Sequence, residues 1–113
     1  MKIDEYKFGE MVIERISYFS DLIIFPKSVK NDWWREEGHL VQPNNLAAIN
    51  LRKIDLLIVG KGLPGLMKIA NSTKRILREN KVELIEASSR KAVEIYNSID
   101  DKEHVVAVFH LTC

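Results

Sequence analysis

The chain has a single cysteine, Cys113, among its 113 residues. An internal disulfide is therefore excluded, and the composition suits a reducing compartment. Apolar runs are also short, since the longest, Val105–Phe109, is far below the length that crosses a bilayer. The first residues carry acidic side chains and no apolar run, so they resemble neither a secretion signal nor an organelle presequence. These absences predict a cytoplasmic protein without a membrane partner.

No excess of charge of either sign is present, because the formal net charge is +1. Such a balance argues against duplex nucleic acid as a dominant partner. One region is locally basic but has no aromatic side chains between its cations, so we interpret it as a solvated helix face. Its cations are Lys68, Lys74, Arg75, Arg78 and Lys81, with Arg52 and Lys53 as an addition from an earlier segment.

Metal-ligand spacing is also lacking. One cysteine and three histidines without a short ligand motif form no zinc pattern, and we expect no metal and no cofactor. Cys113, at the chain end, has His110 three residues before it, so a catalytic Cys–His pair is the interpretation to test. A carboxylate beside the thiol opposes thiolate formation, and neighbours three apart on a strand point to opposite faces. Cys–His catalysis is therefore not the favoured interpretation.

The most informative stretch that is present is Asp55–Gly65. Its apolar residues Leu56–Val59 predict a strand that is buried on both faces. Gly60, Gly62 and Gly65 follow with the spacing G-x-G-x-x-G. The end of such a strand is where α/β proteins usually place their ligand sites.

A dinucleotide site is nevertheless not expected there. That site needs a helix that begins inside the glycine run, whereas Leu63-Pro64 interrupts the run and a helix start appears only at Asn71-Ser72. No P-loop sequence occurs either. We therefore predict that the chain does not bind NAD, FAD or ATP in the manner of nucleotide enzymes. The alternative is that the glycines only turn the chain at a crowded sheet edge.

The order of predicted elements indicates one α/β domain over residues 1–113. Short strands at the N-terminus are followed by a buried strand that Pro26 ends, and strands then alternate with helices from Leu56 onward. The expected elements are strands at 3–8, 11–18, 22–25, 56–59, 82–85 and 105–109, a turn at Glu14-Arg15, a short helix from Pro43 with Leu46 and Ile49 inward, a helix at 72–80, and a helix capped by Ser88 or Ser89 with Ala92, Ile95, Tyr96 and Ile99 inward.

Several stretches together form a wider pattern. They are Leu22–Pro26, Trp33-Trp34-Arg35 with Gly38-His39, the strand that ends in Gly60-x-Gly62, Ala92 with Tyr96-Asn97, and His110–Cys113. Over nearly its whole length the chain resembles the Mth-type domain family. The resemblance implies a three-layer α/β fold: a central mixed, largely parallel sheet, helices packed on it, and an additional N-terminal β layer.

The family brings no established reaction, substrate or cofactor, so the resemblance implies no catalytic residue. Two departures from its pattern matter. Lys61 stands where the family usually has threonine between the two glycines, and Glu14-Arg15 lacks the usual glycine of that turn. The mitochondrial assembly role of some relatives is not implied here, because the chain shows no presequence.

Trp33 and Trp34 are the candidate partner-binding residues. Adjacent residues on an extended backbone point to opposite sides, so one ring can enter the core while the other lies at a rim. An exposed ring would anchor a partner or wall a pocket, although core packing of both is the favoured interpretation. Asp32, Arg35 and His39 nearby suit acid–base work or a satisfied loop network.

Two functions from different classes follow. The first is a non-catalytic binding or assembly module that meets a protein partner through Trp33, Trp34 and the glycine-loop side of the sheet. The alternative is a small-molecule site, enzymatic or not, in which Lys61 and the loop amides hold an anion such as phosphate. Its candidate residues are Gly60, Lys61, Gly62, Gly65, Arg35 and His39.

Overall fold

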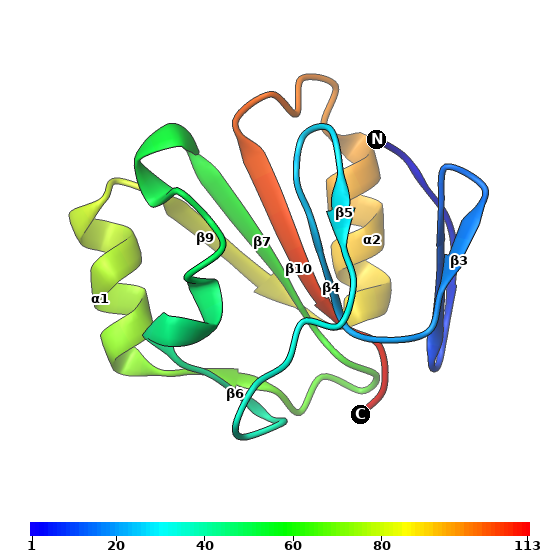
Figure 1. Ribbon diagram of the computed structural model, residues 1–113, viewed down its shortest axis with the longest axis horizontal. Helices are drawn as coiled ribbons and strands as arrows, with labels where there is room; N and C mark the ends of the chain where they lie inside the picture. The colour runs from blue at the N-terminus through cyan, green and yellow to red at the C-terminus, as the bar shows by residue number, and fades with distance from the viewer.

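A five-stranded mixed sheet forms the centre of the computed structural model, which describes residues 1–113 (Figure 1). Its strand order is β5-β4-β10-β7-β9. β7 pairs in parallel with both β9 and β10, and β4 pairs with β10 in the antiparallel sense. The strands are β4 (Leu22–Ile24), β5 (Val29–Lys30), β7 (Leu56–Lys61), β9 (Glu83–Ala87) and β10 (Val105–His110).

The continuous apolar runs of the sequence become the strands with both faces covered. All six residues of β10 are buried. Leu57 and Val59 belong to one apolar core, whereas Ile58 between them belongs to the other, as alternation along a strand requires. The sheet is therefore the middle of three layers, and the expected α/β fold with a mixed sheet is confirmed.

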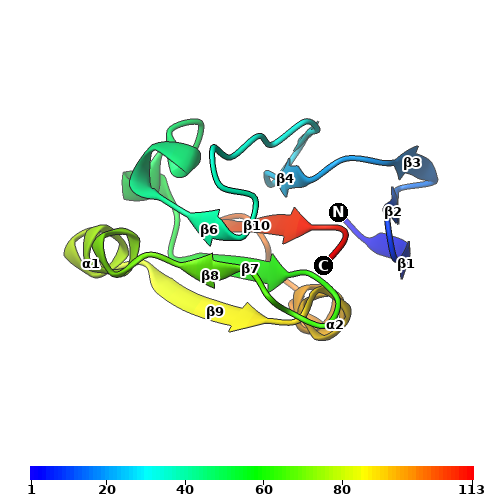
Figure 2. The ribbon, with the colours of Figure 1, turned by 90° about the horizontal axis from the view of Figure 1, so that it is seen from below.

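One outer layer consists of a three-stranded antiparallel sheet and helix α2 (Figure 2). The turn between β2 and β3 lies at Glu14-Arg15, where both residues have positive φ (48° and 69°), the geometry of a tight two-residue hairpin. The expected turn is thus confirmed without glycine. The elements are β1 (Ile3–Lys7), β2 (Glu10–Ile13), β3 (Ile16–Tyr18) and α2 (Ser89–Ser98).

Helix α2 begins as the sequence predicts. The Ser88 side chain accepts a hydrogen bond from the Lys91 amide and thereby caps the first turn. Ala92 and Tyr96 of its inner face are fully buried. Asn97 at its end exchanges two hydrogen bonds with the backbone of Ile3, so the helix holds β1 in place.

The other outer layer contains little regular structure apart from α1. Leu46 and Ile49 of this layer are buried, as we expect from a short helix that begins at Pro43 and turns both residues inward. A two-stranded parallel ladder in this layer was not predicted, because two-residue strands carry no periodicity. The elements are β6 (Leu40–Val41), β8 (Lys68–Ile69), α1 (Asn71–Glu79) and two 3-10 turns, η1 (Pro43–Leu46) and η2 (Leu51–Lys53). Neither α-helix has the length and apolarity that a membrane-spanning helix needs.

Candidate functional site

Four strands present polar side chains at one edge of the central sheet, where β7, β9 and β10 end and β4 begins. His110 lies opposite Lys61 in the register of β10 and β7, and Glu86 lies opposite Val59. The antiparallel register of β4 continues to place Asp21 beside His110. Because side chains alternate along a strand, these four groups share one face of the sheet. We call this region the carboxyl edge.

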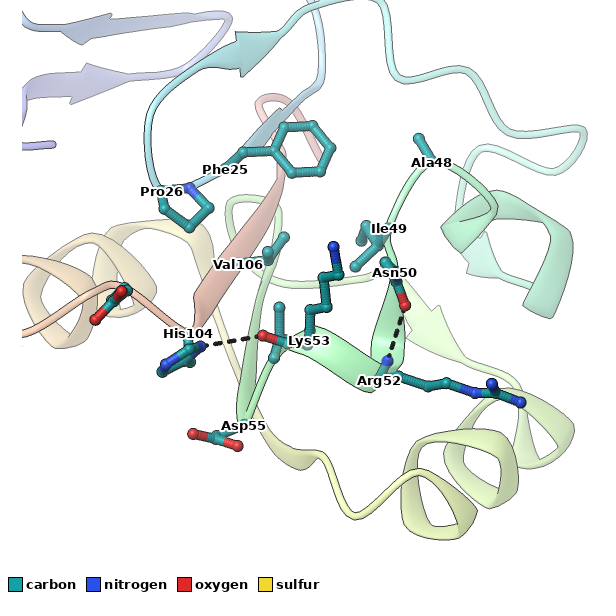
Figure 3. Close-up of a pocket in the computed structure, with 12 residues that line it drawn as sticks. Phe25, Pro26, Ala48, Ile49, Asn50, Arg52, Lys53, Asp55, His104 and Val106 are labelled. Carbon is teal, nitrogen blue, oxygen red and sulfur yellow. Dashed lines mark hydrogen bonds between the residues drawn. The ribbon is translucent and has the colours of Figure 1, made fainter.

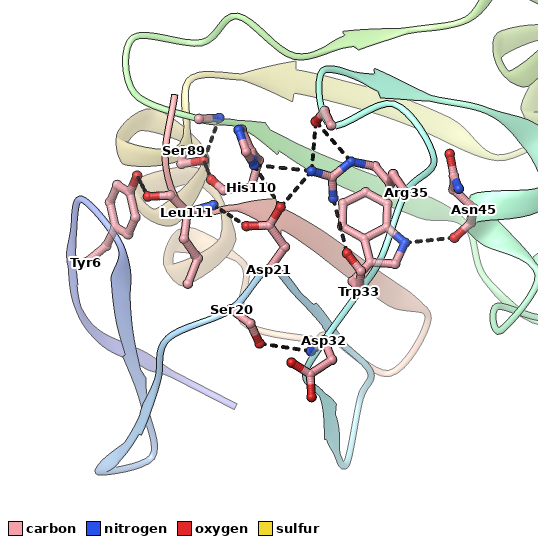
Figure 4. A network of polar contacts seen from close by, with 12 residues as sticks. Tyr6, Ser20, Asp21, Asp32, Trp33, Arg35, Asn45, Ser89, His110 and Leu111 are labelled. Carbon is pink, nitrogen blue, oxygen red and sulfur yellow. Dashed lines mark hydrogen bonds and ion pairs between the residues drawn. The ribbon is translucent and has the colours of Figure 1, made fainter.

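Asp21, Arg35 and His110 form a buried polar network at the carboxyl edge (Figure 4). Asp21 Oδ2 accepts from Arg35 Nη2 at 2.6 Å and from His110 Nδ1 at 2.7 Å. Asp21 Oδ1 accepts from the Leu111 amide at 2.8 Å. One carboxylate therefore joins the first residue before β4, the end of β10 and the chain segment that carries Arg35.

Arg35 is only 7% exposed, and all three of its nitrogens donate to protein acceptors. Besides Asp21, the acceptors are the carbonyl oxygens of Gly38 and Trp33. The guanidinium also lies over the Trp33 ring, 4.5 Å from its centroid. A charged group that is buried and saturated in this way acts as a clamp on the segment between β5 and β6.

The network also sets the protonation state of Asp21. Burial by itself would raise the pKa of this carboxyl group. The hydrogen bonds from His110, the Leu111 amide and Arg35 outweigh burial and hold the pKa below its ordinary value of 3.8. Asp21 is therefore a carboxylate at neutral pH, which accepts hydrogen bonds and cannot donate one.

His110 has one ring nitrogen without a protein partner. Because Asp21 can only accept, Nδ1 is the nitrogen that donates the hydrogen bond to it. Nε2 is buried and makes no hydrogen bond within the protein. The ring of His39 lies edge-on at 5.6 Å between centroids. An imidazole oriented by a carboxylate can accept a proton, which is the chemical capacity of this edge.

In the glycine loop, which we define as Gly60–Gly65, two backbone amides donate to protein oxygens. The Gly62 amide donates to Ser89 Oγ at 2.8 Å, and the Leu63 amide donates to the Thr112 carbonyl at 2.8 Å. Ser89 in turn donates to the backbone carbonyl of His110. The chain then enters β8, and helix α1 begins only at Asn71. The expectation that no helix begins inside the glycine run is confirmed.

The Lys61 side chain is paired with an acidic residue of the protein. Its ammonium group pairs with Glu86 at 3.1 Å, and Lys74 pairs with the same carboxylate at 3.4 Å. Burial would raise the pKa of Glu86, but these two cations hold it below its ordinary value. The charges of Lys61 and Arg35 are therefore already balanced within the protein, by Glu86 and by Asp21.

The two tryptophans lie on opposite sides, as an extended backbone predicts. Trp33 is 5% exposed and donates from its indole nitrogen to the Asn45 carbonyl at 2.8 Å. Trp34 is 74% exposed. The expectation that both rings pack in the core is therefore wrong for Trp34. A partner-binding role stays a prediction for both residues, and of the two only Trp34 has an exposed ring.

Large apolar side chains are exposed in the segments that surround the carboxyl edge. Gly9 donates to the Leu111 carbonyl, and the amide of Trp33 donates to the Asp21 carbonyl, so these segments are tied to the ends of the central strands. We call the four exposed side chains the carboxyl-edge surface. They are Phe8 (57% exposed), Phe19 (73%), Trp34 (74%) and Leu66 (53%).

The acid that pairs with Arg35 is Asp21 and not Asp32, which lies nearer to Arg35 in the sequence. Asp32 is exposed with φ of 56°, and only its amide is bonded here, to Ser20 Oγ. The carboxylate that Arg35 uses is Asp21. A lone acid directly before the all-apolar strand β4 is the one signal in the sequence that pointed to it. Cys113 is exposed, whereas His110 is buried.

Comparisons with known proteins agree with this architecture. The model of a family described as protein of unknown function (DUF498/DUF598) matches residues 3–110. A conserved hypothetical protein of Pyrococcus horikoshii OT3 is 23% identical with a TM-score of 0.86, over 100% of both chains. A protein of Rhodopseudomonas palustris is 26% identical with a TM-score of 0.78, over 96% of this chain and 81% of that one. A Mth938-like domain of Bordetella pertussis is 14% identical with a TM-score of 0.70, over 97% and 85%. The resemblance to the Mth-type domain family is thereby confirmed.

Proposed function

The chain belongs to the DUF498/DUF598 family of proteins of unknown function, and we propose that it is a non-catalytic binding module that meets a partner protein at its carboxyl-edge surface. The observation that carries the proposal is Trp34, a tryptophan with 74% of its surface exposed. Tryptophan is among the side chains most enriched at the energetic centres of protein interfaces. Phe19, Phe8 and Leu66 add apolar area around the same edge.

The frame beneath Trp34 supports this function. Both of its neighbours are anchored: Trp33 is buried, and Arg35 is bonded to Asp21, Gly38 and Trp33. The backbone that presents the exposed ring is therefore fixed before a partner arrives. Preorganisation of this kind lowers the entropic cost of binding. The saturated donors of Arg35 also suit a structural clamp better than a group that must bind substrate.

The alternative function, a small-anion site at the glycine loop, has less support. Lys61 is paired with Glu86, and the amides of Gly62 and Leu63 already donate to protein oxygens. An anion would have to displace Glu86 from Lys61 before it gained that charge. Of the other candidates, Arg35 is bonded to Asp21, and Gly60 is buried.

Photo-crosslinking tests the proposed surface directly. A photoreactive phenylalanine analogue would be placed at Trp34 in one variant and at Ile16 in a matched control. Ile16 is also a large exposed apolar residue (56%), but it follows the hairpin turn of β3 instead of lying at the carboxyl edge. We expect one discrete crosslinked protein from position 34 and none from position 16.

The captured protein would then be purified and its affinity measured with Trp34→Ser and Ile16→Ser variants. Loss of a central aromatic contact costs about 2 kcal/mol or more, so Trp34→Ser should weaken binding by at least about 30-fold. Ile16→Ser should bind as the parent does. Equal capture from both positions would refute the surface. A crosslinked product that contains only this chain would show that the surface binds a second copy of the chain and not a different protein.

A further inference from the structure

The largest cavity of the protein lies away from the carboxyl edge, where β7 and β10 begin (Figure 3). Its volume is about 610 Å³. Clefts of about 300–1,000 Å³ are the usual size of small-molecule sites. The cavity is built from the segment after β4, from η2 and its flanking residues, and from the turn before β10. None of these residues belongs to the surface described above.

The inner wall of this cavity is apolar and rigid. Ile49, Ile54 and Val106 line it and are 6%, 8% and 1% exposed, so each is anchored in the core beneath. Phe25 and Pro26 form a second wall where the chain leaves β4. An apolar molecule that enters here removes its own surface and the half-buried faces of Phe25 and Pro26 from water, which is the main source of affinity in such pockets.

The rim carries a cation that the protein does not neutralise. Lys53 lines the cavity, and its side chain extends along it towards the end where Ile49 lies (Figure 3). No carboxylate lies within 4.0 Å of its ammonium group, in contrast to Lys61, Lys74 and Arg35. A charge-assisted bond to a ligand anion is therefore available to Lys53 without the loss of an internal ion pair.

Other rim groups limit the charge that a ligand can bring. Asp55 and Glu103 also line the cavity, and the Asp55 carboxylate points away from the Lys53 ammonium group. Their negative charge opposes a second anionic group on the ligand. His104 lies beside them and shares a hydrogen bond of 3.2 Å with the Lys53 carbonyl, which fixes the backbone of η2. Arg52 projects outward.

We propose that this cavity binds a small amphipathic monoanion, an aliphatic or aromatic carboxylate, whose apolar body lies on Ile49, Ile54 and Val106 and whose carboxylate pairs with Lys53. The cavity volume sets the size class, the walls favour an apolar body, and Lys53 offers a partner for one negative charge. The proposal is independent of the partner surface at the carboxyl edge.

Calorimetry with four probes tests the ligand class. Octanoate has an apolar chain and one negative charge. 1-Octanol has the same chain without charge, octylamine has the opposite charge, and inorganic phosphate has negative charge without an apolar chain. We expect saturable binding of octanoate, with weaker binding of octanol and octylamine and no binding of phosphate. Octanol or octylamine that binds as tightly as octanoate would overturn the proposal, as would an absence of octanoate binding.

The variants Lys53→Met and Lys68→Met test which lysine pairs with the octanoate carboxylate. Both lysines are exposed, but only Lys53 lines the cavity. The charge-assisted bond predicts that Lys53→Met weakens octanoate about tenfold and leaves octanol unchanged, whereas Lys68→Met changes neither. Methyl NMR should show octanoate shifts at Ile49 and Ile54. Shifts confined to other methyl groups, or equal losses in the two variants, would place the ligand elsewhere.

Discussion

Gly62 shows at the scale of one residue how closely the carboxyl edge is packed. Its φ is +93°, a conformation that side chains rarely adopt. A Cβ atom added there would lie 2.5 Å from the Thr112 carbonyl oxygen and 2.7 Å from Cδ2 of His110. The glycine is therefore required by the close approach of the C-terminal segment as well as by the turn, and this requirement exists without any ligand.

Gly62→Ala should lower the free energy of unfolding by at least about 2 kcal/mol, because backbone strain and overpacking act together. Gly38→Ala is the matched control, since its added Cβ meets nothing within 4 Å and its φ is not positive. That variant should remain within about 0.5 kcal/mol of the parent. Urea denaturation measures both, and equal midpoints for the two variants would show that the loop relaxes freely.

Asp21 gives the protein a defined dependence of stability on pH. Its pKa in the folded protein lies below the ordinary value of 3.8, so the carboxylate stabilises the fold above that pH. This contribution is lost as the pH falls through the folded pKa. Asp21→Asn leaves the buried Arg35 without its charge partner and should cost about 3 kcal/mol or more at pH 7.

The difference between parent and Asp21→Asn should shrink as the pH is lowered below about 4. Unfolding free energies measured by urea titration from pH 7 to pH 3 give this difference. Asp32→Asn serves as the control, because that exposed carboxylate forms no ion pair, and its stability difference should stay near zero throughout. If Asp21→Asn lowered the free energy of unfolding equally at every pH, the contribution of Asp21 would come from packing and not from its charge.

At the scale of elements, the long periodic or apolar segments could be predicted and the short ones could not. β7, β9, β10 and α2 follow from apolar runs and the serine cap, since these signals are local. β6 and β8 consist of two residues each and depend on a partner distant in sequence. The same limit hid Asp21, whose partners Arg35 and His110 are 14 and 89 residues away. Contacts of that kind exist only after the sheet has formed.

Asn97 tests how the N-terminal sheet is held to the rest of the domain. Its side chain accepts from the Ile3 amide at 3.0 Å and donates to the Ile3 carbonyl at 2.8 Å. Asn97→Ala removes both bonds and should cost about 1–2 kcal/mol, together with faster amide exchange in β1. Ser98→Ala, which loses only a bond to its own helix at the Ile95 carbonyl, should change neither. Unchanged exchange in β1 would mean that the apolar core alone holds this sheet.

At the scale of the whole molecule, the two proposed binding regions lie at opposite ends of the central strands. The residue before Trp34 donates a backbone hydrogen bond to Asp21, which directly precedes β4. Lys53 lies just before the start of β7, at the other end of the sheet. β7 has six residues, so its ends are separated by roughly 15–20 Å. Between them lies a buried sheet, and no hydrogen bond links the Arg35 network to the residues around Lys53.

Sites at that separation without shared partners behave additively. Trp34→Ser should therefore weaken capture of the partner protein and leave the octanoate dissociation constant within about twofold of the parent, which corresponds to less than about 0.5 kcal/mol. Lys53→Met should have the reverse effect. Octanoate titration of each variant, and capture of the partner at saturating octanoate, measure both directions. A larger effect of either variant on the other binding region would require a conformational link through β7 and β10. Coupling between two ligands is reciprocal, so such a link must also appear when the partner is captured at saturating octanoate.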